Sequence, residues 1–472
     1  MTQYQNHSVL ISNLLDYKGY GGRMLSIRRK MQSSYADDMN KKSSWFEFST
    51  IIVGSKAEGL SGPLENDSDI MKVLKDTVCK EHFTSVTYER EHQFKLALDH
   101  SRPGYSLLQT IQICNSVWTA TLLYESMVEL APNTLYLSSE FLKNKIKALI
   151  IDGLCKMPRS QEFVNIHNET QGPSIVFDSP GLTDTVTALR CECPSYLSAW
   201  LCRERNYQWP PIAVVREVSN LDSHVVPVGH TASCFQFLEW RICFTKGEIR
   251  LVHSLNDCLI KVLILLKQIA KVTLKPLSKD MSTYLMKNVV FWLAELNDYD
   301  CFTQYALIVA LKKALAYLKH FVVTNNFPSY MIPQRNLLEG KLTHSQRIKI
   351  CMRIDSLLKE GPHMVLKIAK IRTAISMCYK SPTVFSRISM KLHEIHIILY
   401  LFAHLYIHSL PETPHNLADT TRSYFSSRIA GFILCRLSSS MLDVEQCYKD
   451  LGYFKFSDSG DNISSLISEM LC

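Results

Sequence analysis

Asp67 and Asp69, two aspartates separated by a single residue, are the side chains of this 472-residue chain whose types and spacing could do chemistry. On a strand the two carboxylates point to the same face, roughly 7 Å apart, because side chains alternate. Hard divalent cations such as Mg²⁺ take oxygen ligands, and a pair of them can activate an attacking hydroxyl in phosphoryl transfer. Gly54 and Ser55 stand ahead of the pair, after an apolar run. A Gly-Ser turn there lets backbone N–H groups and a hydroxyl approach a triphosphate.

The combination of these features is more specific than any one of them. A lone Asp-x-Asp is usually a solvated turn, and an EF-hand is excluded because Lys72 stands where that loop needs glycine. A strand, Gly-Ser, a fixed gap, Asp-x-Asp and a second strand together are similar to the signature of the nucleotidyltransferase superfamily, which includes the polymerase beta-like enzymes. That signature requires a third carboxylate, for which Asp184 at the start of "DTVTALRC" is the candidate. Asp178 is the alternative, but Ser179-Pro180-Gly181 beside it favours a surface turn.

Strands and helices at defined places must position these residues. Residues 8–35 carry apolar clusters at helical spacing, which predicts one long amphipathic helix or two shorter ones. We expect strands in "FEFSTIIV" before Gly54, in "ENDSDIMKVL" through the aspartates, and in "TDTVTALRC" and "HVVPVGH" farther on. After Trp240, apolar residues recur at three- and four-residue steps, which predicts a helical second half as far as the Pro-containing break at 409–416.

The predicted fold class is α+β, with a mixed-sheet core of the nucleotidyltransferase (polymerase beta-like) kind, an N-terminal spine helix and a C-terminal helical lobe. We expect the core with its N-terminal helix over residues 1–245, the helical lobe over 246–380, and a helical and polar extension over 381–472. The apolar stretch "IHIILYLFAHLYIHSL" at 395–410 falls short of the roughly twenty apolar residues of a membrane span and contains three histidines. It is more typical of a buried or partner-facing helix.

A resemblance to a known family rests on several of these motifs taken in order. They are "GSKAEGL" with "DSDIM", then "DTVTALRCECPS", "VVPVGH", "LEWRICFTKGEIRLVHSLNDCLIKVLILLKQI" and "STYLMKNVVFWLAE". Over roughly residues 45–360 the chain resembles the male-abnormal (Mab) domain family and, within it, the cyclic GMP-AMP synthase-like receptors. The resemblance implies an enzyme that joins two nucleoside triphosphates, such as ATP and GTP, into a cyclic dinucleotide messenger of innate antiviral immunity once double-stranded nucleic acid binds.

The resemblance also implies roles for individual residues. Gly54 and Ser55 would meet the triphosphate, and Asp67, Asp69 and Asp184 would hold two Mg²⁺ or Mn²⁺ ions. The other residues that it places at nucleotides are Arg241, Thr245, Glu248, Lys267, Thr283 and Tyr284. Lys267 would reach phosphates of the donor, and Tyr284 would meet a base. Each has a plainer alternative: Arg241 could pair with Glu239 or Glu248, Lys267 could be solvated, and Tyr284 could be core.

The trigger is predicted from a departure from the family pattern. Cyclic GMP-AMP synthase carries a zinc-binding insertion after the Trp-Arg strand, whereas "GEIRLVHSLNDCLIKVL" runs straight on here. No zinc is expected, because His230 and Cys234 lack a third and fourth ligand at plausible spacing. We therefore expect double-stranded RNA, bound through phosphates and 2′-hydroxyls. The candidate contacts are Arg23, Arg28, Arg29, Lys30, Lys41 and Lys42, with Arg347, Lys349 and Arg353 in the helical lobe, although such clusters more commonly form a solvated face.

Composition sets the remaining limits. The net charge of +8 permits polyanionic partners without requiring them, and fifteen irregularly spaced cysteines without a secretory signal indicate reduced thiols. We expect a cytoplasmic protein without a membrane partner, and a two-fold dimer on nucleic acid stays open. A catalytically inactive Mab-domain interaction or developmental protein is the alternative function, and an oligonucleotide-forming transferase on the same core is a third. Which bases would be joined, and through which linkage, stays open.

Overall fold

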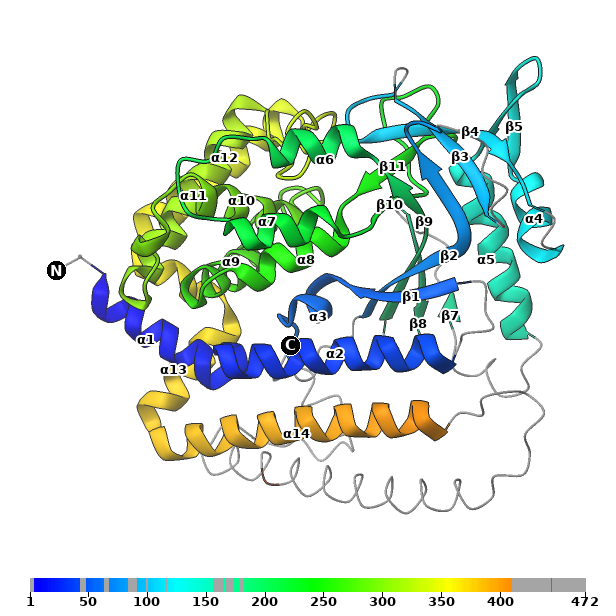
Figure 1. The fold of residues 1–472 in the computed structure, drawn as a ribbon. Helices are drawn as coiled ribbons and strands as arrows, with labels where there is room; N and C mark the ends of the chain where they lie inside the picture. Colours follow the sequence, from blue (N-terminus) through cyan, green and yellow to red (C-terminus); the bar gives the residue numbers. More distant parts are fainter. Residues whose placement is uncertain are drawn as a thin grey trace.

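The structure is a computed structural model that describes residues 4–42, 48–62, 68–83, 91–98, 101–114, 117–155, 165–166, 173–178, 182–409 and 443. The second N-terminal helix runs beneath a strongly bent β-sheet, the first lies beside the helical half, and helices from the second half of the sequence pack against one end of the sheet (Figure 1). Within the described ranges, no helix is both long enough and apolar enough to span a membrane.

The N-terminal segment forms two helices, which is one of the two arrangements the sequence allows. They are α1 (Gln5–Leu15) and α2 (Gly22–Lys42), separated by a kink at Asp16–Tyr20. Gly19 has φ +83° in the kink, in the left-handed region that glycine enters without a steric penalty. The long helix α2 then packs against β1 and α3, so it lies directly below the strand that leads to Gly54 (Figure 1).

The strands form one mixed sheet. They are β1 (Phe48–Val53), β2 (Ser68–Lys80), β3 (His92–Ala97), β4 (Tyr105–Gln112), β5 (Met127–Ala131), β6 (Thr134–Leu137), β7 (Asn165–Ile166), β8 (Ser174–Asp178), β9 (Leu182–Glu192), β10 (Ser223–Val226) and β11 (Trp240–Cys243). Their order is β1-β2-β3-β4-β11-β10-β9-β8-β7, and a further parallel pairing of β2 with β9 closes the central strands into a ring. The predicted strand at 183–191 is confirmed as β9. In "HVVPVGH" the strand ends at Val226, before Pro227, which has no N–H to donate.

The second half is helical, as predicted. Its helices are α8 (Thr245–Ser254), α9 (Asp257–Ile269), α10 (Thr283–Glu295), α11 (Leu307–Thr324), α12 (His344–Glu360), α13 (Ala369–Lys380) and α14 (Pro382–Ser409). The first half adds α3 (Gly54–Glu58), α4 (Val117–Tyr124), α5 (Ser139–Cys155), α6 (Pro194–Leu201) and α7 (Ile212–Ser219). Almost every residue of α9 and α10 is buried, so these two are core helices around which the others pack.

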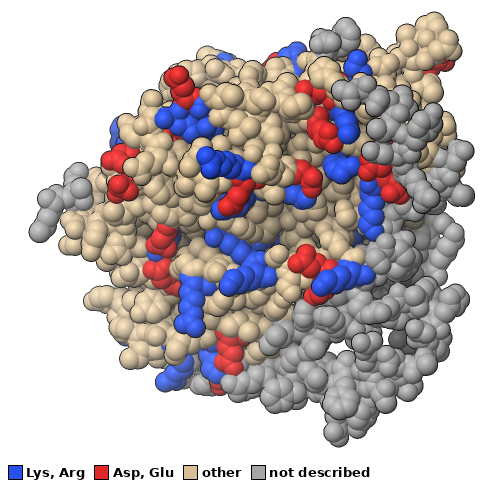
Figure 2. All heavy atoms as spheres, viewed as in Figure 1, with Lys and Arg blue, Asp and Glu red and all other residues tan. Residues whose placement is uncertain are grey.

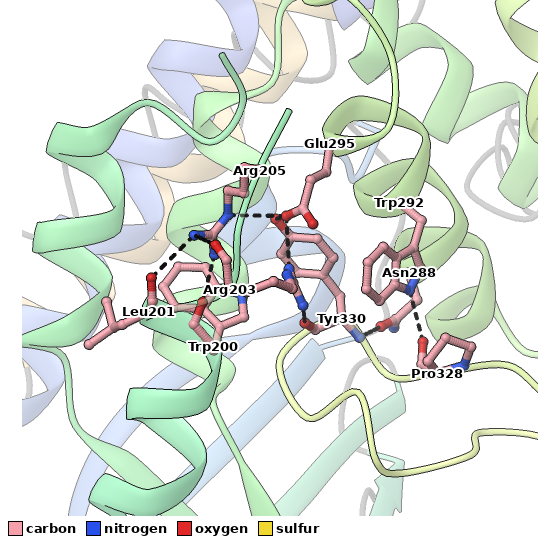
Figure 3. A network of polar contacts seen from close by, with 9 residues as sticks. All are labelled: Trp200, Leu201, Arg203, Arg205, Asn288, Trp292, Glu295, Pro328 and Tyr330. Carbon is pink, nitrogen blue, oxygen red and sulfur yellow. Dashed lines mark hydrogen bonds and ion pairs between the residues drawn. The ribbon is translucent and has the colours of Figure 1, made fainter. Parts of the chain in front are cut away.

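A polar cluster joins the sheet half to the helical half (Figure 3). Glu295 of α10 is 3% exposed, and its Oε2 accepts hydrogen bonds from Arg203 (2.8 Å), Arg205 (3.2 Å) and the Tyr330 hydroxyl (2.6 Å). The guanidinium carbon of Arg203 also lies 4.6 Å from the centre of the Tyr330 ring. A buried carboxylate with several donors is stable only while all of them are present, so this cluster fixes how the segment after α6 meets α10.

Helix α14 lies alongside α2 on the side away from the sheet (Figure 1). Phe385, Ile388 and Ile395 of α14 are buried, and the Phe385 ring meets the Tyr17 ring edge-on at 5.5 Å. At the start of the apolar stretch, Ile395 and Ile398 of this helix are therefore buried, whereas Ile397 is exposed. The mixed sheet and the helical C-terminal region confirm the predicted mixture of sheet and helices.

Candidate active site

Asp69 and Asp184 lie opposite each other on neighbouring strands. Strands β2 and β9 pair in parallel, and the register aligns Asp69 with Asp184 and Met71 with Val186. Paired positions on adjacent strands are about 4.8 Å apart and point to the same face, so both carboxylates emerge side by side. Asp67, the third predicted acid, lies outside the described residues. Asp178 ends β8 opposite Leu182, two positions along β9 from Asp184.

Gly54 forms the turn beneath Asp69. It follows β1 directly, opens α3, and has φ +64°. A Cβ on Gly54 would lie 1.9 Å from Oδ2 of Asp69, far inside contact distance. Only glycine therefore lets the turn and the aspartate occupy this space together, which explains why the sequence places a glycine between the two strands.

Apolar residues line the face of the sheet that carries the two aspartates. Because side chains alternate, Asp69 shares its face with Met71 and Val73, and Asp184 shares its face with Val186 and Ala188. Met71, Val73 and Ala188 form a small buried cluster with Val226, which Val53, Val186 and Cys243 extend. The carboxylates thus stand at the end of an apolar surface, which suits a pocket that takes a ring with a charged group at one end.

Arg241 belongs to the same face of the sheet. Val226 pairs with Arg241 on β11, and Arg241 pairs with Tyr105 on β4. Residues paired in register point the same way, so the guanidinium lies two strands across from Asp184. Glu239 and Glu248, the alternative partners considered for Arg241, are engaged elsewhere: Glu239 accepts from the His230 backbone N–H at 2.7 Å, and Glu248 pairs with Lys287 at 2.8 Å.

Lys267 reaches the Gly-Ser turn from the helical half. Its Nζ lies 3.3 Å from the Ser55 hydroxyl and 3.0 Å from Oε2 of Glu58. Glu58 is 2% exposed and also pairs with Lys287 at 3.1 Å. Burial alone would raise the pKa of Glu58, but Lys267 and Lys287 outweigh it and hold that pKa at about 2. The lysine predicted to meet phosphate is therefore already held beside Ser55 by a buried carboxylate.

The ion-pair network continues to the residues predicted at the base. Lys287 pairs with Glu248 as well as Glu58, and the Tyr284 hydroxyl donates to Glu248 at 2.9 Å. The ammonium of Lys287 also lies 5.3 Å from the centre of the Tyr284 ring. Burial raises the pKa of the Tyr284 hydroxyl, and Glu248 adds to that shift, so the phenol stays neutral and keeps its proton for donation.

The two threonines mark helix starts. Thr245 is the first residue of α8, and Thr283, which is exposed, is the first residue of α10, one position before Tyr284. Glu58 and Lys287 thus link the pair Ser55 and Lys267 to the pair Glu248 and Tyr284. Sheet register connects Asp69, Asp184 and Arg241.

Side chains that the sequence analysis did not assign to this role hold the backbone of α3. Arg28 and Arg29 of α2 donate to the carbonyls of Gly59 (2.8 Å) and Glu58 (3.0 Å). The ring nitrogen Nε2 of His253 lies 2.9 Å from the Ala57 carbonyl. Burial and the nearby Arg29 lower the pKa of His253 to about 4, so the ring is neutral and its N–H is the donor. Three consecutive carbonyls after the Gly-Ser turn are therefore fixed by α2 and α8.

The basic positions of α2 divide by helix face. Arg23, Lys30 and Lys41 are exposed and fall on one line of the helix, because steps of seven and eleven residues are close to whole turns. Arg28 is 3% exposed and lies inside the protein, so it is a structural residue and not a surface contact for nucleic acid. Arg29 is half-buried, and the Lys42 side chain lies outside the described set. Over the face shown in Figure 2, basic side chains are interspersed with acidic ones.

The donor set of the aspartates suits a hard divalent cation. Asp69 and Asp184 offer carboxylate oxygens from adjacent paired positions, which is the ligand chemistry of Mg²⁺ or Mn²⁺. Across the described part of the chain, no three His, Cys, Asp or Glu side chains are arranged to hold a metal ion, and Asp67 is not among the residues searched. The two placed aspartates are thus compatible with the predicted metal chemistry.

Comparison with known proteins identifies one domain within the chain. Residues 240–356, from the start of β11 to near the end of α12, match the sequence model of the Mab-21 protein HhH/H2TH-like domain. This stretch of the chain, about a quarter of its length, is therefore similar to the Mab-21 HhH/H2TH-like domain. The curated proteins searched include no match to the chain.

Proposed function

We propose that this chain is a metal-dependent nucleotidyltransferase that joins two nucleoside triphosphates, ATP and GTP among the candidates, into a cyclic dinucleotide. The observation that carries the proposal is the register that sets Asp69 opposite Asp184, with Gly54 packed against Asp69 and Ser55 next in the chain. The match to the Mab-21 domain supports the same class of protein.

The reaction follows from the groups at this face. Asp69 and Asp184, with Asp67 from the neighbouring segment, would hold two Mg²⁺ or Mn²⁺ ions, which supply charge stabilisation for phosphoryl transfer. A ribose hydroxyl of one nucleotide attacks the α-phosphorus of the other, the bond to the β-phosphate breaks, and pyrophosphate leaves. Asp184 accepts the proton of the attacking hydroxyl. A second round on the linear product closes the ring.

Residues of the two halves would position the nucleotides. Ser55 and Lys267 lie together and offer a hydroxyl and a point charge to the donor phosphates. A phosphate there would compete with Glu58 for Lys267, so nucleotide binding redistributes the charge of the Glu58 network. The Tyr284 ring, held by Glu248, offers a face on which a base can stack.

The activator that we propose is double-stranded RNA, in the setting of innate antiviral sensing in the cytoplasm. The chain passes from β11 to α8 without an insertion, so the zinc-bearing segment associated with DNA sensing is missing from the sequence. Arg23, Lys30 and Lys41 on one exposed line of α2, with Asp37 as the acidic residue among them, give that line a net positive charge, which supports a polyanionic partner. A two-fold dimer on the duplex belongs to the same proposal.

The second candidate is a Mab-21 domain protein that keeps the fold without catalysis. The observation that favours it is the ion pair of Lys267 with buried Glu58, at 3.0 Å, which occupies the charge that a phosphate would need. A protein that used its site only as scaffolding would gain stability from such a pair.

A turnover assay separates the two candidates. The full chain is incubated with the four labelled ribonucleoside triphosphates and Mg²⁺ or Mn²⁺, with and without long duplex RNA or DNA. We expect a phosphatase-resistant product that requires duplex RNA and that disappears in Asp69→Asn and Asp184→Asn. Asp76→Asn is the matched control, because Asp76 lies on the same strand, β2, but seven residues beyond Asp69, where the pairing with β9 is interrupted between Leu74 and Val78. If no product forms with either duplex and either metal, the non-catalytic candidate stands.

A further inference from the structure

A second polar pocket, of about 160 Å³, lies at the far side of the face that carries the aspartates. Its walls come from β4, β11 and the loops at 228–231 and 334–341. Four cationic side chains line it: Arg102, Arg241, Arg335 and Lys341. We call it the basic pocket.

The basic pocket carries more positive charge than its acidic neighbours balance. Glu339 is the carboxylate that lines it, and that carboxylate forms an ion pair with Arg102. Among the described residues, Arg241, Arg335 and Lys341 form no ion pair with any carboxylate. Three cations therefore converge without a counter-charge in contact, and such an arrangement is stable chiefly when an anion joins it.

Arg335 is held in place by its surroundings. Its guanidinium carbon lies 5.1 Å from the centre of the Tyr105 ring, and one of its nitrogens is 3.5 Å from the Tyr105 hydroxyl. Its alkyl chain crosses Gly104, where a Cβ would come within 2.8 Å of Arg335 Cδ. A guanidinium already stacked on an aromatic ring loses little freedom on binding, so its free N–H groups are ready for a ligand.

The pKa of Lys341 reflects the positive charge of the basic pocket. Partial burial of its ammonium group, with Arg335 and Arg241 nearby, lowers the pKa of Lys341 to about 8, against a weaker opposing effect of Asp280. A bound anion would offset this repulsion and raise that pKa. The residue as a whole is exposed, so Lys341 stands at the mouth of the basic pocket.

Size and position indicate which part of a ligand the basic pocket takes. It is smaller than the roughly 300–1,000 Å³ of pockets that enclose whole drug-sized ligands. Counting two strands across and four residues along from Asp184 places the Arg241 backbone about 16 Å away. The basic pocket is thus a site for one end of a ligand that lies across the apolar floor.

We propose that the basic pocket binds the phosphate chain of a nucleotide, with Arg335 and Lys341 as phosphate contacts that neither the resemblance nor the domain match assigns. Guanidinium and ammonium groups are the side chains that best recognise phosphate, through charge-assisted hydrogen bonds. This assignment rests on the proposed function: the phosphate chain in the basic pocket is that of the acceptor nucleotide, whereas Ser55, Lys267 and the aspartates bind the donor triphosphate.

The test is calorimetric binding of inorganic triphosphate to the full chain in EDTA, where turnover cannot occur. We expect Arg335→Gln and Lys341→Gln each to raise the Kd at least tenfold, equivalent to about 1.4 kcal/mol. Arg216→Gln, which changes an exposed arginine on α7, is the matched control and should leave the Kd within about twofold. An unchanged Kd in both pocket variants overturns the proposal. Lys341→Gln keeps the test valid if Arg335→Gln unfolds, because Lys341 lies at the exposed mouth.

Two further arms identify the source of the phosphate. If GTP competes with inorganic triphosphate, and guanosine does not, the ligand is the phosphate chain of a nucleotide. If guanosine binds and Arg335→Gln abolishes its binding, the pocket recognises a base and the proposal is wrong. If inorganic triphosphate binds in the basic pocket but no turnover is found, the pocket proposal holds and the proposed function is wrong. If turnover is found but the Kd is the same in both pocket variants, the proposed function holds and the pocket proposal is wrong.

Discussion

Replacement of Glu58 by glutamine removes the charge on which the lysines of the site depend. Glu58 is 2% exposed and sits 3.0 Å from Lys267 and 3.1 Å from Lys287. Glutamine keeps the shape and one hydrogen-bonding oxygen, so the change isolates the charge. Lys287 retains Glu248 as a partner, whereas Lys267 is left beside Ser55 with no carboxylate in the described contacts.

The expected cost follows from the burial of this network. Removing one partner of a buried ion pair typically costs about 3–5 kcal/mol, because the remaining charge stays buried without compensation. We therefore expect Glu58→Gln to lower the free energy of unfolding by about 3 kcal/mol at pH 7. Glu125→Gln is the matched control: it breaks the surface pair with Lys145 and should cost about 0–1 kcal/mol, since Glu125 is 57% exposed.

The same variant makes a prediction about pH. The pKa of Glu58 is about 2 in the folded protein against an ordinary 4.5, so the unfolded chain takes up the proton first as the pH falls. The stability that Glu58 contributes is present above about pH 4.5 and is lost as the pH falls toward 2. The gap between the native chain and Glu58→Gln should shrink by about 2 kcal/mol between pH 7 and pH 3.

Urea unfolding of both variants at pH 7 and at pH 3, followed by circular dichroism, measures these quantities. A loss at pH 7 no larger than that of Glu125→Gln, or a gap that stays constant down to pH 3, would refute the argument that Glu58 is a charged, buried anchor of the site.

The remaining predictions concern the turn, the C-terminal helix and a histidine. Gly54→Ala should cost about 1–3 kcal/mol in urea unfolding, because of its φ of +64° and the clash with Asp69, whereas Gly22→Ala, with nothing within 4 Å, should be nearly neutral; equal effects would contradict this. Ile395→Ala should lower the free energy of unfolding by about 2–5 kcal/mol, since Ile395 of α14 is 0% exposed, and a loss under about 1 kcal/mol would mean that α14 does not pack as described. His253, with its pKa lowered to about 4, contributes stability that is present above pH 6.5 and is lost as the pH falls toward 4, by up to about 3 kcal/mol; His253→Gln should remove this pH dependence, and an unchanged slope would count against a neutral ring.

The sequence predicts those site residues whose position depends only on their immediate neighbours in the chain. Gly54 and Ser55 follow an apolar strand, and the alternation around Asp69 and Asp184 is strong enough to place both on strands. The nucleotidyltransferase signature required a third carboxylate, with Asp184 as the candidate, and the parallel register of β2 with β9 sets Asp184 opposite Asp69. Local pattern alone could not supply that pairing, because the two aspartates are far apart in the chain.

The parts that the sequence does not predict depend on contacts between distant segments. Glu58 lies inside the motif "GSKAEGL", yet its partner Lys287 is 229 residues away, and no local spacing reveals the pair. In α2, helical periodicity places Arg28 and Lys30 on different faces, but it does not show which of these faces is buried against other elements. That choice is made by α3 on one side and α14 on the other, and α14 lies beyond the matched domain.

Helix α2 is packed between the sheet and α14, so most substitutions in it should affect stability as they would in a core helix (Figure 1). Its strongly exposed positions from Arg23 onward follow one narrow strip, made of Arg23, Ser26, Lys30, Ser33, Asp37 and Lys41. Substitutions elsewhere on α2 alter packing and are subject to selection for stability, whereas the strip can change with little effect on folding. Sequence drift among relatives that share α14 should therefore concentrate on this strip, and the charge of the strip is free to evolve with whatever partner meets it.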